Sequence, residues 1–303
     1  MVTLPDAPNK PLGNCPACGS ATWIPSGKVK DDSVTGEWFD LMECPGCHLR
    51  ATSPMPAPNE IGRYYASEAY ISHSDSRAGL INQIYHAART FMLKRKKSWV
   101  INACDKGKGS LLEVGAGTGH FAHFMQSHGW TVTALEPDEK ARQLGAEKLA
   151  MQMQPIDLLD HLPSYSYDAI TLWHVLEHVH DPGHYLRRFR ELLKPGGALI
   201  IAVPNYTSRD GSIYKTGWAA YDVPRHLWHF SPSSMERILQ KHLFTLSGKI
   251  PMHLDAFYVS MLSEKYRGHS FLATLLGSIS GFGTYLATLG DRDKASSLIY
   301  IAK

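Results

Sequence analysis

The stretch Leu111–Gly119 combines an apolar run, an acid and three glycines at alternate positions. Because glycine lacks Cβ, the backbone at Gly115, Gly117 and Gly119 can take unusual dihedral angles and lie directly against a ligand. The pattern predicts a strand whose carboxyl end meets a bound nucleoside. A dinucleotide fingerprint would need a third glycine where His120 stands, so the spacing is G-x-G-x-G instead.

A second group of residues has the chemistry for proton transfer. Residues 221–230 contain an acid, an arginine and two histidines, directly before a predicted helix start at Ser231-Pro232. An unperturbed imidazole titrates near pH ~6.5, which suits a general base. We predict that His226 is this base and that Arg225 and Asp222 orient it or hold an anionic group of the substrate. The alternative, in which this segment only folds over the core with its histidines satisfied, stays open at this point.

Four cysteines form two C-x-x-C pairs and predict a tetrahedral zinc site. The ligands are Cys15, Cys18, Cys44 and Cys47. Four thiolates leave no open coordination position, so the site is expected to be structural. Two disulfides are the alternative, which a cytoplasmic chain makes improbable.

Several strands and turns must position these groups. Residues 131–136 have the β-branched and apolar content of a strand, and Glu136 ends it about 20 residues past the first glycine, where an acid can bind ribose hydroxyls. Residues 167–173 predict a third strand, which leads into a Leu-Glu-His element. Residues 194–203 predict a Lys-Pro-Gly-Gly turn and a fourth strand.

These landmarks, in this order, resemble the class I S-adenosylmethionine-dependent methyltransferases. The resemblance is close over residues 110–245. It implies an α/β fold with a doubly wound, Rossmann-like, mostly parallel sheet of seven strands. It also implies S-adenosylmethionine as the methyl donor and S-adenosylhomocysteine as the product.

The resemblance further implies roles for individual residues. Glu113 and the loop Gly115, Ala116, Gly117, Thr118 and Gly119 would contact the methionine end of the cofactor. Glu136, followed by Pro137, would bind the ribose, and Asp157 the adenine. Trp173 and His174 would lie beside the cofactor, with His174 close enough to act in catalysis. Glu177 and His178 would order the loop, although a metal site within residues 173–182 is an alternative.

The predicted domain organisation has three parts. Residues 1–55 form a zinc-ribbon-like module, residues 56–109 a helical linker and residues 110–303 the methyltransferase domain. Within the last part, residues 205–230 would be an aromatic-rich insertion that caps the substrate pocket. Residues 265–295 would be a helical insertion before the last strand.

The composition of the chain limits which partners and which cellular compartment are expected. The chain has 303 residues, 44% of them hydrophobic, and a net charge of +3, which is too small to indicate a polyanionic partner. The N-terminus lacks the apolar core of a secretion signal, so a cytoplasmic location is expected. Residues 270–290 carry no charge, yet their glycines and helical spacing favour a packed helix or helical hairpin over a membrane span. A homodimer interface, or contact with a membrane surface or lipid-like substrate, is an alternative for this stretch.

The leading functional hypothesis is methyl transfer to oxygen or carbon of a small molecule such as a sugar, a quinone-like compound or another metabolite. A zinc-ribbon module before such a domain loosely resembles sugar C-methyltransferases. An RNA methyltransferase is the second hypothesis, although the weak charge and the absence of Asn-Pro-Pro-Tyr after residue 172 argue against it. A cofactor-binding interaction protein without catalysis is the third.

Overall fold

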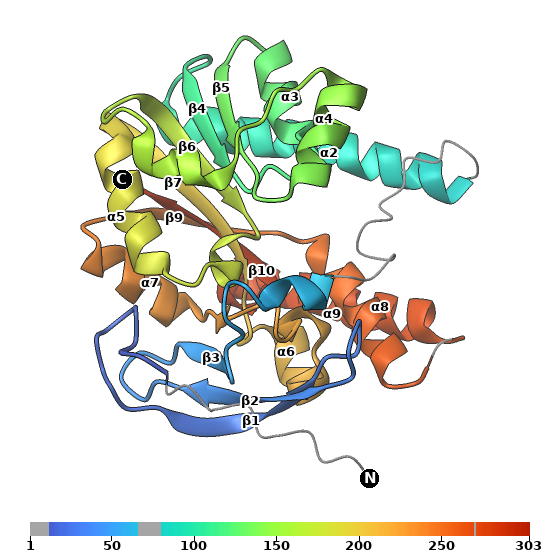
Figure 1. The fold of residues 1–303 in the computed structure, drawn as a ribbon. Helices are drawn as coiled ribbons and strands as arrows, with labels where there is room; N and C mark the ends of the chain where they lie inside the picture. The colour runs from blue at the N-terminus through green and yellow to red at the C-terminus, as the bar shows by residue number, and fades with distance from the viewer. Residues whose placement is uncertain (1–11, 66–79, 270) are drawn as a thin grey trace.

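A mixed six-stranded sheet forms the centre of the protein, whose computed structural model describes residues 12–65, 80–269 and 271–303 (Figure 1). In spatial order the strands are β5, Thr131–Leu135; β4, Ser110–Val114; β6, Tyr167–Trp173; β7, Leu193–Pro204; β10, Ser297–Ala302; and β9, Leu246–Pro251. The first four pair in parallel, whereas β10 is antiparallel to both of its neighbours. The predicted α/β class and mostly parallel sheet are confirmed.

The predicted number of seven strands was wrong, because the described residues form six in this sheet. Beyond β5 the chain makes a single parallel bridge, between Leu135 and Gln154. Pro155 follows at once and has no N–H to extend the pairing. The chain then enters the 3-10 helix η2, Ile156–His161. The outermost strand therefore stops after one residue.

Successive side chains along each strand point to opposite faces of the sheet, so the core has one part on each face. Leu199 and Ile201 of β7 belong to one cluster and Ala198 and Ile200 to the other. The first face packs against α5, Pro182–Leu192, and α7, Pro232–Lys241. The second packs against α2, Leu80–Cys104, and α3, His120–Ser127. The helix α4, Glu139–Leu149, follows β5.

Side-chain caps begin both helices that pack on the first face, α5 and α7. Asp181 accepts a hydrogen bond from the amide of His184 at the start of α5. Ser231 forms a capping box with Ser234 at the start of α7. Each cap satisfies amides that a helix leaves unpaired in its first turn. The helix start predicted at Ser231-Pro232 is confirmed.

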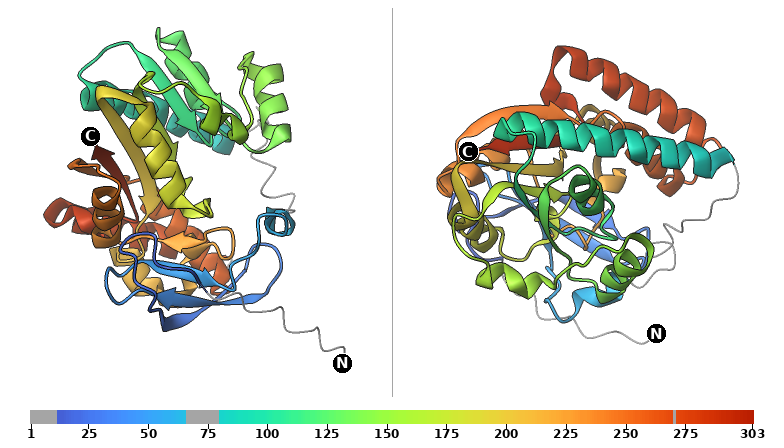
Figure 2. Two further views of the ribbon diagram at one scale, coloured as in Figure 1. Left: turned by 60° about the vertical axis from the view of Figure 1, so that its left-hand side comes forward. Right: turned by 90° about the horizontal axis from the view of Figure 1, so that it is seen from above.

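A second, smaller sheet contains the N-terminal strands and part of the predicted cap. Its order is β1, Ile24–Lys30; β2, Trp38–Glu43; β3, Arg50–Ser53; and β8, Trp228–His229. The 3-10 helix η1, Ile61–Tyr65, follows β3. Figures 1 and 2 place this sheet at one end of the molecule, with β3 towards the main domain. The pairing of β3 with β8 ties the ribbon to the cap through backbone hydrogen bonds.

The rest of the cap and the late insertion are helical. The cap contains α6, Arg209–Tyr214, and the 3-10 helices η4, Lys215–Gly217, and η5, Ala219–Tyr221. The insertion contains α8, Asp255–Tyr266; α9, Ala273–Gly290; and η6, Arg292–Lys294. A Cβ added at Gly277 of α9 would lie 2.4 Å from Cα of Met261 in α8, so the two helices pack closely. Residues 270–290 were predicted as a packed helix or a helical hairpin; the structure has one helix there, α9, which pairs with α8, and α8 begins ten residues before the predicted insertion at 265–295. Among the described residues, no helix has the length and apolar character to cross a membrane.

Candidate active site and metal centre

The glycine-rich loop joins β4 to α3 and requires glycine at several positions. Gly115 and Gly119 have φ angles of 70° and 78°, which residues with a Cβ rarely adopt. A Cβ on Gly115 would also lie 2.4 Å from Cγ2 of Val175. The loop therefore packs against the turn after β6, so the predicted cofactor loop and the Leu-Glu-His element share one edge of the sheet.

Glu136 follows β5 and braces this loop. Its side chain is 7% exposed and accepts hydrogen bonds from the amides of Gly117 at 2.7 Å and Asp138 at 2.9 Å. A carboxylate has about four acceptor positions, so these two bonds leave capacity for ribose hydroxyls. Thr118 and Pro137 are exposed beside it. This geometry suits the ribose role that the sequence suggested.

Glu113 is a buried acid in β4. It is 3% exposed, and its Oε2 has no hydrogen-bond partner among the described residues. Burial raises the pKa of Glu113 to about 8, although the positive charge of Lys96 acts in the opposite direction. A ligand ammonium group would satisfy this oxygen, since buried polar atoms almost always have partners. The residue therefore fits the methionine end of the predicted cofactor.

Lys96 belongs to the basic run at residues 94–97 of α2, but its side chain is only partly exposed to solvent. Its Nζ lies 4.5 Å from the centroid of the Trp173 ring. In a helix, consecutive side chains point about 100° apart, so a run of four cannot all face solvent. Trp173 is buried and contacts Phe121 edge to face, with the ring centroids 5.5 Å apart. Lys96 and Trp173 thus lie close to Glu113.

Asp157, the predicted adenine contact, is exposed in η2, beyond the edge strand β5. The segment just before it forms the bridge between Gln154 and Leu135, the last residue of β5, which directly precedes Glu136. Its role in binding adenine stays a prediction.

His174 is held between two carboxylates directly after β6. Its Nε2 lies 3.1 Å from Asp255 Oδ2, and its Nδ1 lies 3.4 Å from Glu177 Oε1. Its φ of 58° is unusual for a residue with a Cβ, and its amide donates to the carbonyl of Ala202 at 2.9 Å. Burial by itself would lower the pKa of His174, but Asp255 and then Glu177 raise it to about 10. The ring is therefore a cation at neutral pH.

Replacing Asp255 by asparagine is expected to lower the pKa of His174 from about 10 towards its ordinary value of 6.5. The ion pairs of the native protein contribute their full stability below pH 6.5 and lose it as the pH rises through about 10, because pairing raises this pKa. NMR titration of the imidazole measures the shift. An unchanged titration curve in the variant would show that Asp255 does not hold the charge.

Glu177, His178 and His226 form a buried cluster whose ligand atoms lie within 4.8 Å of one another. The Nδ1 atoms of His178 and His226 donate to the carbonyls of Arg225 at 3.0 Å and Ala220 at 2.9 Å. Each Nε2 therefore keeps a lone pair. Burial and the neighbouring His226 lower the pKa of His178 to about 4. The cluster can accept a proton, and its donor set could also hold a metal ion.

The cluster connects the Leu-Glu-His element, which forms the 3-10 helix η3, Leu176–His178, to the cap. The amide of Leu227 donates to the carbonyl of Glu177 at 2.8 Å, and Trp228 Nε1 donates to that of Val179 at 2.8 Å. The element therefore orders the loop, as predicted. The Glu177 side chain is fully buried, and within the described part of the chain neither of its oxygens accepts a well-formed hydrogen bond.

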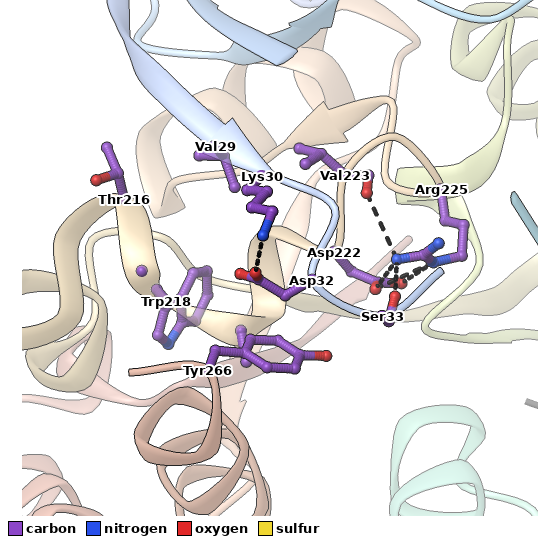
Figure 3. Close-up of a pocket in the computed structure, with 12 residues that line it drawn as sticks. Val29, Lys30, Asp32, Ser33, Thr216, Trp218, Asp222, Val223, Arg225 and Tyr266 are labelled. Atoms are coloured by element: carbon purple, nitrogen blue, oxygen red, sulfur yellow. Dashed lines mark hydrogen bonds and ion pairs between the residues drawn. The ribbon is translucent and has the colours of Figure 1, made fainter. Parts of the chain in front are cut away.

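Arg225 lies in a buried network between the cap and the ribbon (Figure 3). Its guanidinium donates to Asp222 Oδ1 at 2.7 Å, Asp31 Oδ1 at 3.0 Å, the carbonyl of Tyr64 at 2.9 Å and the hydroxyl of Ser33. At 1% exposure it is not available to an anionic substrate group. Of its two predicted roles, the geometry therefore leaves only orientation of the segment that carries His226.

Asp222 is the member of this network nearest to the predicted base. Its Oδ2 lies 3.9 Å from His226 Nε2, and its side chain is 26% exposed. The ion pair between Arg225 and Asp222 holds the turn before His226 in place. The nearby His229 is buried, and its Nε2 lies 3.0 Å from the hydroxyl of Thr52, so it packs between the cap and the ribbon.

The four cysteines converge as a metal site requires. Their Sγ atoms lie within 4.8 Å of one another, with Cys15–Cys47 at 3.5 Å and Cys18–Cys44 at 3.4 Å. These separations are too long for disulfide bonds. A hydrogen bond from Cys47 lowers the pKa of Cys15 to about 5. A closed set of four sulfurs, one already favouring the thiolate, fits structural zinc.

Three residues of these networks escaped sequence reasoning. Asp255 starts α8, Asp31 follows β1 and Lys96 belongs to a basic run. No local pattern separates Asp255 or Asp31 from ordinary surface acids. For Lys96, the helical period in α2 was a signal that could have found it.

Comparison with known proteins identifies the family of this chain. A family model described as a methyltransferase domain matches residues 85–246, more than half of the chain. Two curated relatives are both named ubiquinone biosynthesis O-methyltransferase. The one from Caulobacter sp. (strain K31) is 34% identical over 35% of this chain and 45% of that protein. The one from Xanthomonas oryzae pv. oryzae (strain PXO99A) is 32% identical over 42% of this chain and 56% of that protein. The chain thus spans about half the length of these relatives.

Solved structures with similar folds include two methyltransferases. Geranyl diphosphate C-methyltransferase from Streptomyces coelicolor A3(2) aligns with a TM-score of 0.49 and 14% identity, over 76% of this chain and 86% of that chain. A SAM-dependent methyltransferase from Archaeoglobus fulgidus aligns with a TM-score of 0.45 and 20% identity, over 70% and 94%.

Proposed function

This chain belongs to the methyltransferase-domain family, and we propose that it transfers a methyl group from S-adenosylmethionine to an oxygen or carbon atom of a small molecule. The family confirms the class I methyltransferase resemblance and the methyl donor that it implied. One observation carries the proposal. The glycine loop with Glu113 and Glu136 lies at the same sheet edge as His174 and the pair His178–His226, in contact through Val175.

The proposed reaction is an in-line displacement at the methyl carbon that is bound to the sulfonium sulfur. The acceptor atom forms a bond to the methyl carbon while the bond from carbon to sulfur breaks. The electron pair stays on sulfur and yields S-adenosylhomocysteine. His226 Nε2 accepts the acceptor's proton, while His178 beside it remains neutral. Such a base contributes typically about 10²–10⁴-fold to the rate, and alignment of donor and acceptor supplies much of the rest.

The proposed acceptor is a sugar, a quinone-like compound or another metabolite. The curated relatives are named for ubiquinone biosynthesis, which supports a quinone-like acceptor. The cap's aromatic side chains Tyr214, Trp218 and Tyr221 are buried and pack its core, so they order the segment that carries His226 and do not contact the acceptor. A cytoplasmic location belongs to the same proposal. Contact with RNA or a lipid surface is left to experiment.

Transfer of label from methyl-labelled S-adenosylmethionine into small-molecule, RNA, protein and lipid fractions of a cell extract tests the proposal. We expect label among small molecules, and we expect His226→Ala to reduce its rate by about 10²-fold or more with little change in donor affinity. His184→Ala is the matched control, because His184 is partly exposed and pairs with Asp160 outside the cluster.

The other outcomes each contradict part of the proposal. Label in RNA would assign the ribbon to nucleic-acid recognition. Donor binding without transfer to any fraction would indicate an interaction protein. Full activity of His226→Ala would show that residues 221–230 only fold the cap.

A further inference from the structure

The late helical insertion exposes more large apolar side chains than any other described part of the chain. Six of them lie on α9, between 48% and 67% exposed: Leu272, at its N-cap, then Leu275, Ile279, Phe282, Leu286 and Leu289. Phe271 is 97% exposed, and Tyr258 on α8 is 60% exposed. Figure 1 shows α8 and α9 at the edge of the molecule, away from β4 and β5. A contiguous apolar surface of this kind marks an interaction site.

The spacing of the six side chains identifies the kind of partner. They follow one another at intervals of three, four, three, four and three residues. Alternating intervals of three and four place apolar residues along one narrow seam, and this seam packs against another helix by inserting side chains between those of the partner. We name these six residues the α9 seam.

The opposite side of α9 is already occupied. Cβ atoms added at Gly277 and Gly281 would lie 2.4 Å and 2.8 Å from Cα atoms of α8, and Thr284 is fully buried. Residues 270–290 carry no charge. A helix that lies on a membrane surface typically presents lysine and arginine on its polar face. α9 has neither a free polar face nor a basic side chain, which favours a protein partner over a lipid surface.

We propose that the α9 seam pairs with the α9 seam of a second copy of this chain about a twofold axis. A seam of this type is complementary to itself, as a twofold interface requires. At about 100 Å² for each exposed side chain, the seam offers roughly 600 Å² per copy, to which Phe271 and Tyr258 add. A stable interface buries about 800 Å² per partner, so the available surface is of the right size. With no charge on α9, no repulsion opposes the contact.

Light scattering and sedimentation of the full-length chain test the proposal. We expect a dimer for the natural sequence, and Leu275→Glu to raise the dissociation constant at least about 100-fold, because a buried carboxylate without a partner is costly. Phe282→Glu is a second variant at the same seam. Leu243→Glu is the matched control, since Leu243 is 79% exposed in the connection between α7 and β9. Thermal unfolding checks that each variant folds.

Two results would overturn the proposal. One is a monomer at every concentration up to about 100 μM, because a dimer with a dissociation constant above that value is only weakly associated. The other is binding of the monomer to phosphatidylglycerol-containing vesicles that Leu275→Glu abolishes, because the seam would then contact lipid. Neither readout depends on methyl transfer, so failure of the proposed activity would leave the dimer unaffected.

Discussion

Glu136→Ala is expected to lower the affinity for S-adenosylmethionine about 100-fold. A hydrogen bond to a charged group contributes about 1.5–3 kcal/mol, and a ribose can donate two of them to this carboxylate. The variant also removes the acceptor that holds the Gly117 amide at 2.7 Å, so the loop loses its brace. Isothermal titration with S-adenosylmethionine and with S-adenosylhomocysteine measures the change.

Two further variants separate ligand binding from loop support. Glu139→Ala changes an exposed acid in the first turn of α4 and is expected to bind the cofactor normally. Glu136→Gln retains one carbonyl acceptor, so an intermediate affinity is expected. Natural affinity in Glu136→Ala would rule out the ribose role of this residue.

Cys44→Ser is expected to lose the metal and to unfold the ribbon. The natural chain should hold one zinc per molecule, measured by elemental analysis, and the variant close to none. Zinc binding to four-ligand sites contributes about 10 kcal/mol or more to folding in small peptides. A large fall in the melting temperature of the ribbon is therefore expected, and a strong chelator should reproduce it.

Loss of zinc should also impair the active site. β3 pairs with β8 beside the cap, Asp31 binds Arg225, and the hydroxyl of Tyr206 donates to the carbonyl of His48 at 2.6 Å. When the ribbon melts, these contacts to the segment around His226 are lost. We expect kcat to fall at least tenfold, about 1.4 kcal/mol of barrier.

Cys104→Ser is the control for this experiment. Cys104 is buried, lies outside the cluster and donates to the carbonyl of Asp168 at 3.2 Å, a bond that serine can also make. It should keep its zinc and its activity. If Cys44→Ser kept both as well, the cysteines would not form the metal centre.

Local patterns predicted the parts of the site that one short segment forms. The C-x-x-C pairs indicated the metal cluster, and the strand before Gly115 indicated the cofactor loop, because spacing within a segment directly sets which groups face each other. The count of seven strands failed where Gln154 forms a single bridge and Pro155 ends it. Pairing of an edge strand depends on its neighbour as well as on its own composition.

The sequence by itself predicted the fold class and, through its resemblance to the class I methyltransferases, the family and the methyl donor. The spacing of the cysteines predicted the four that converge in one cluster. Only the tertiary structure decided that His174 lies between Glu177 and Asp255, and that His226 meets His178. It also decided that the guanidinium N–H groups of Arg225 donate hydrogen bonds to Asp31 and other groups of the protein. The physical reason is that charges interact through space, and residues 31, 174, 225 and 255 become neighbours only when the ribbon, sheet, cap and late helices pack together.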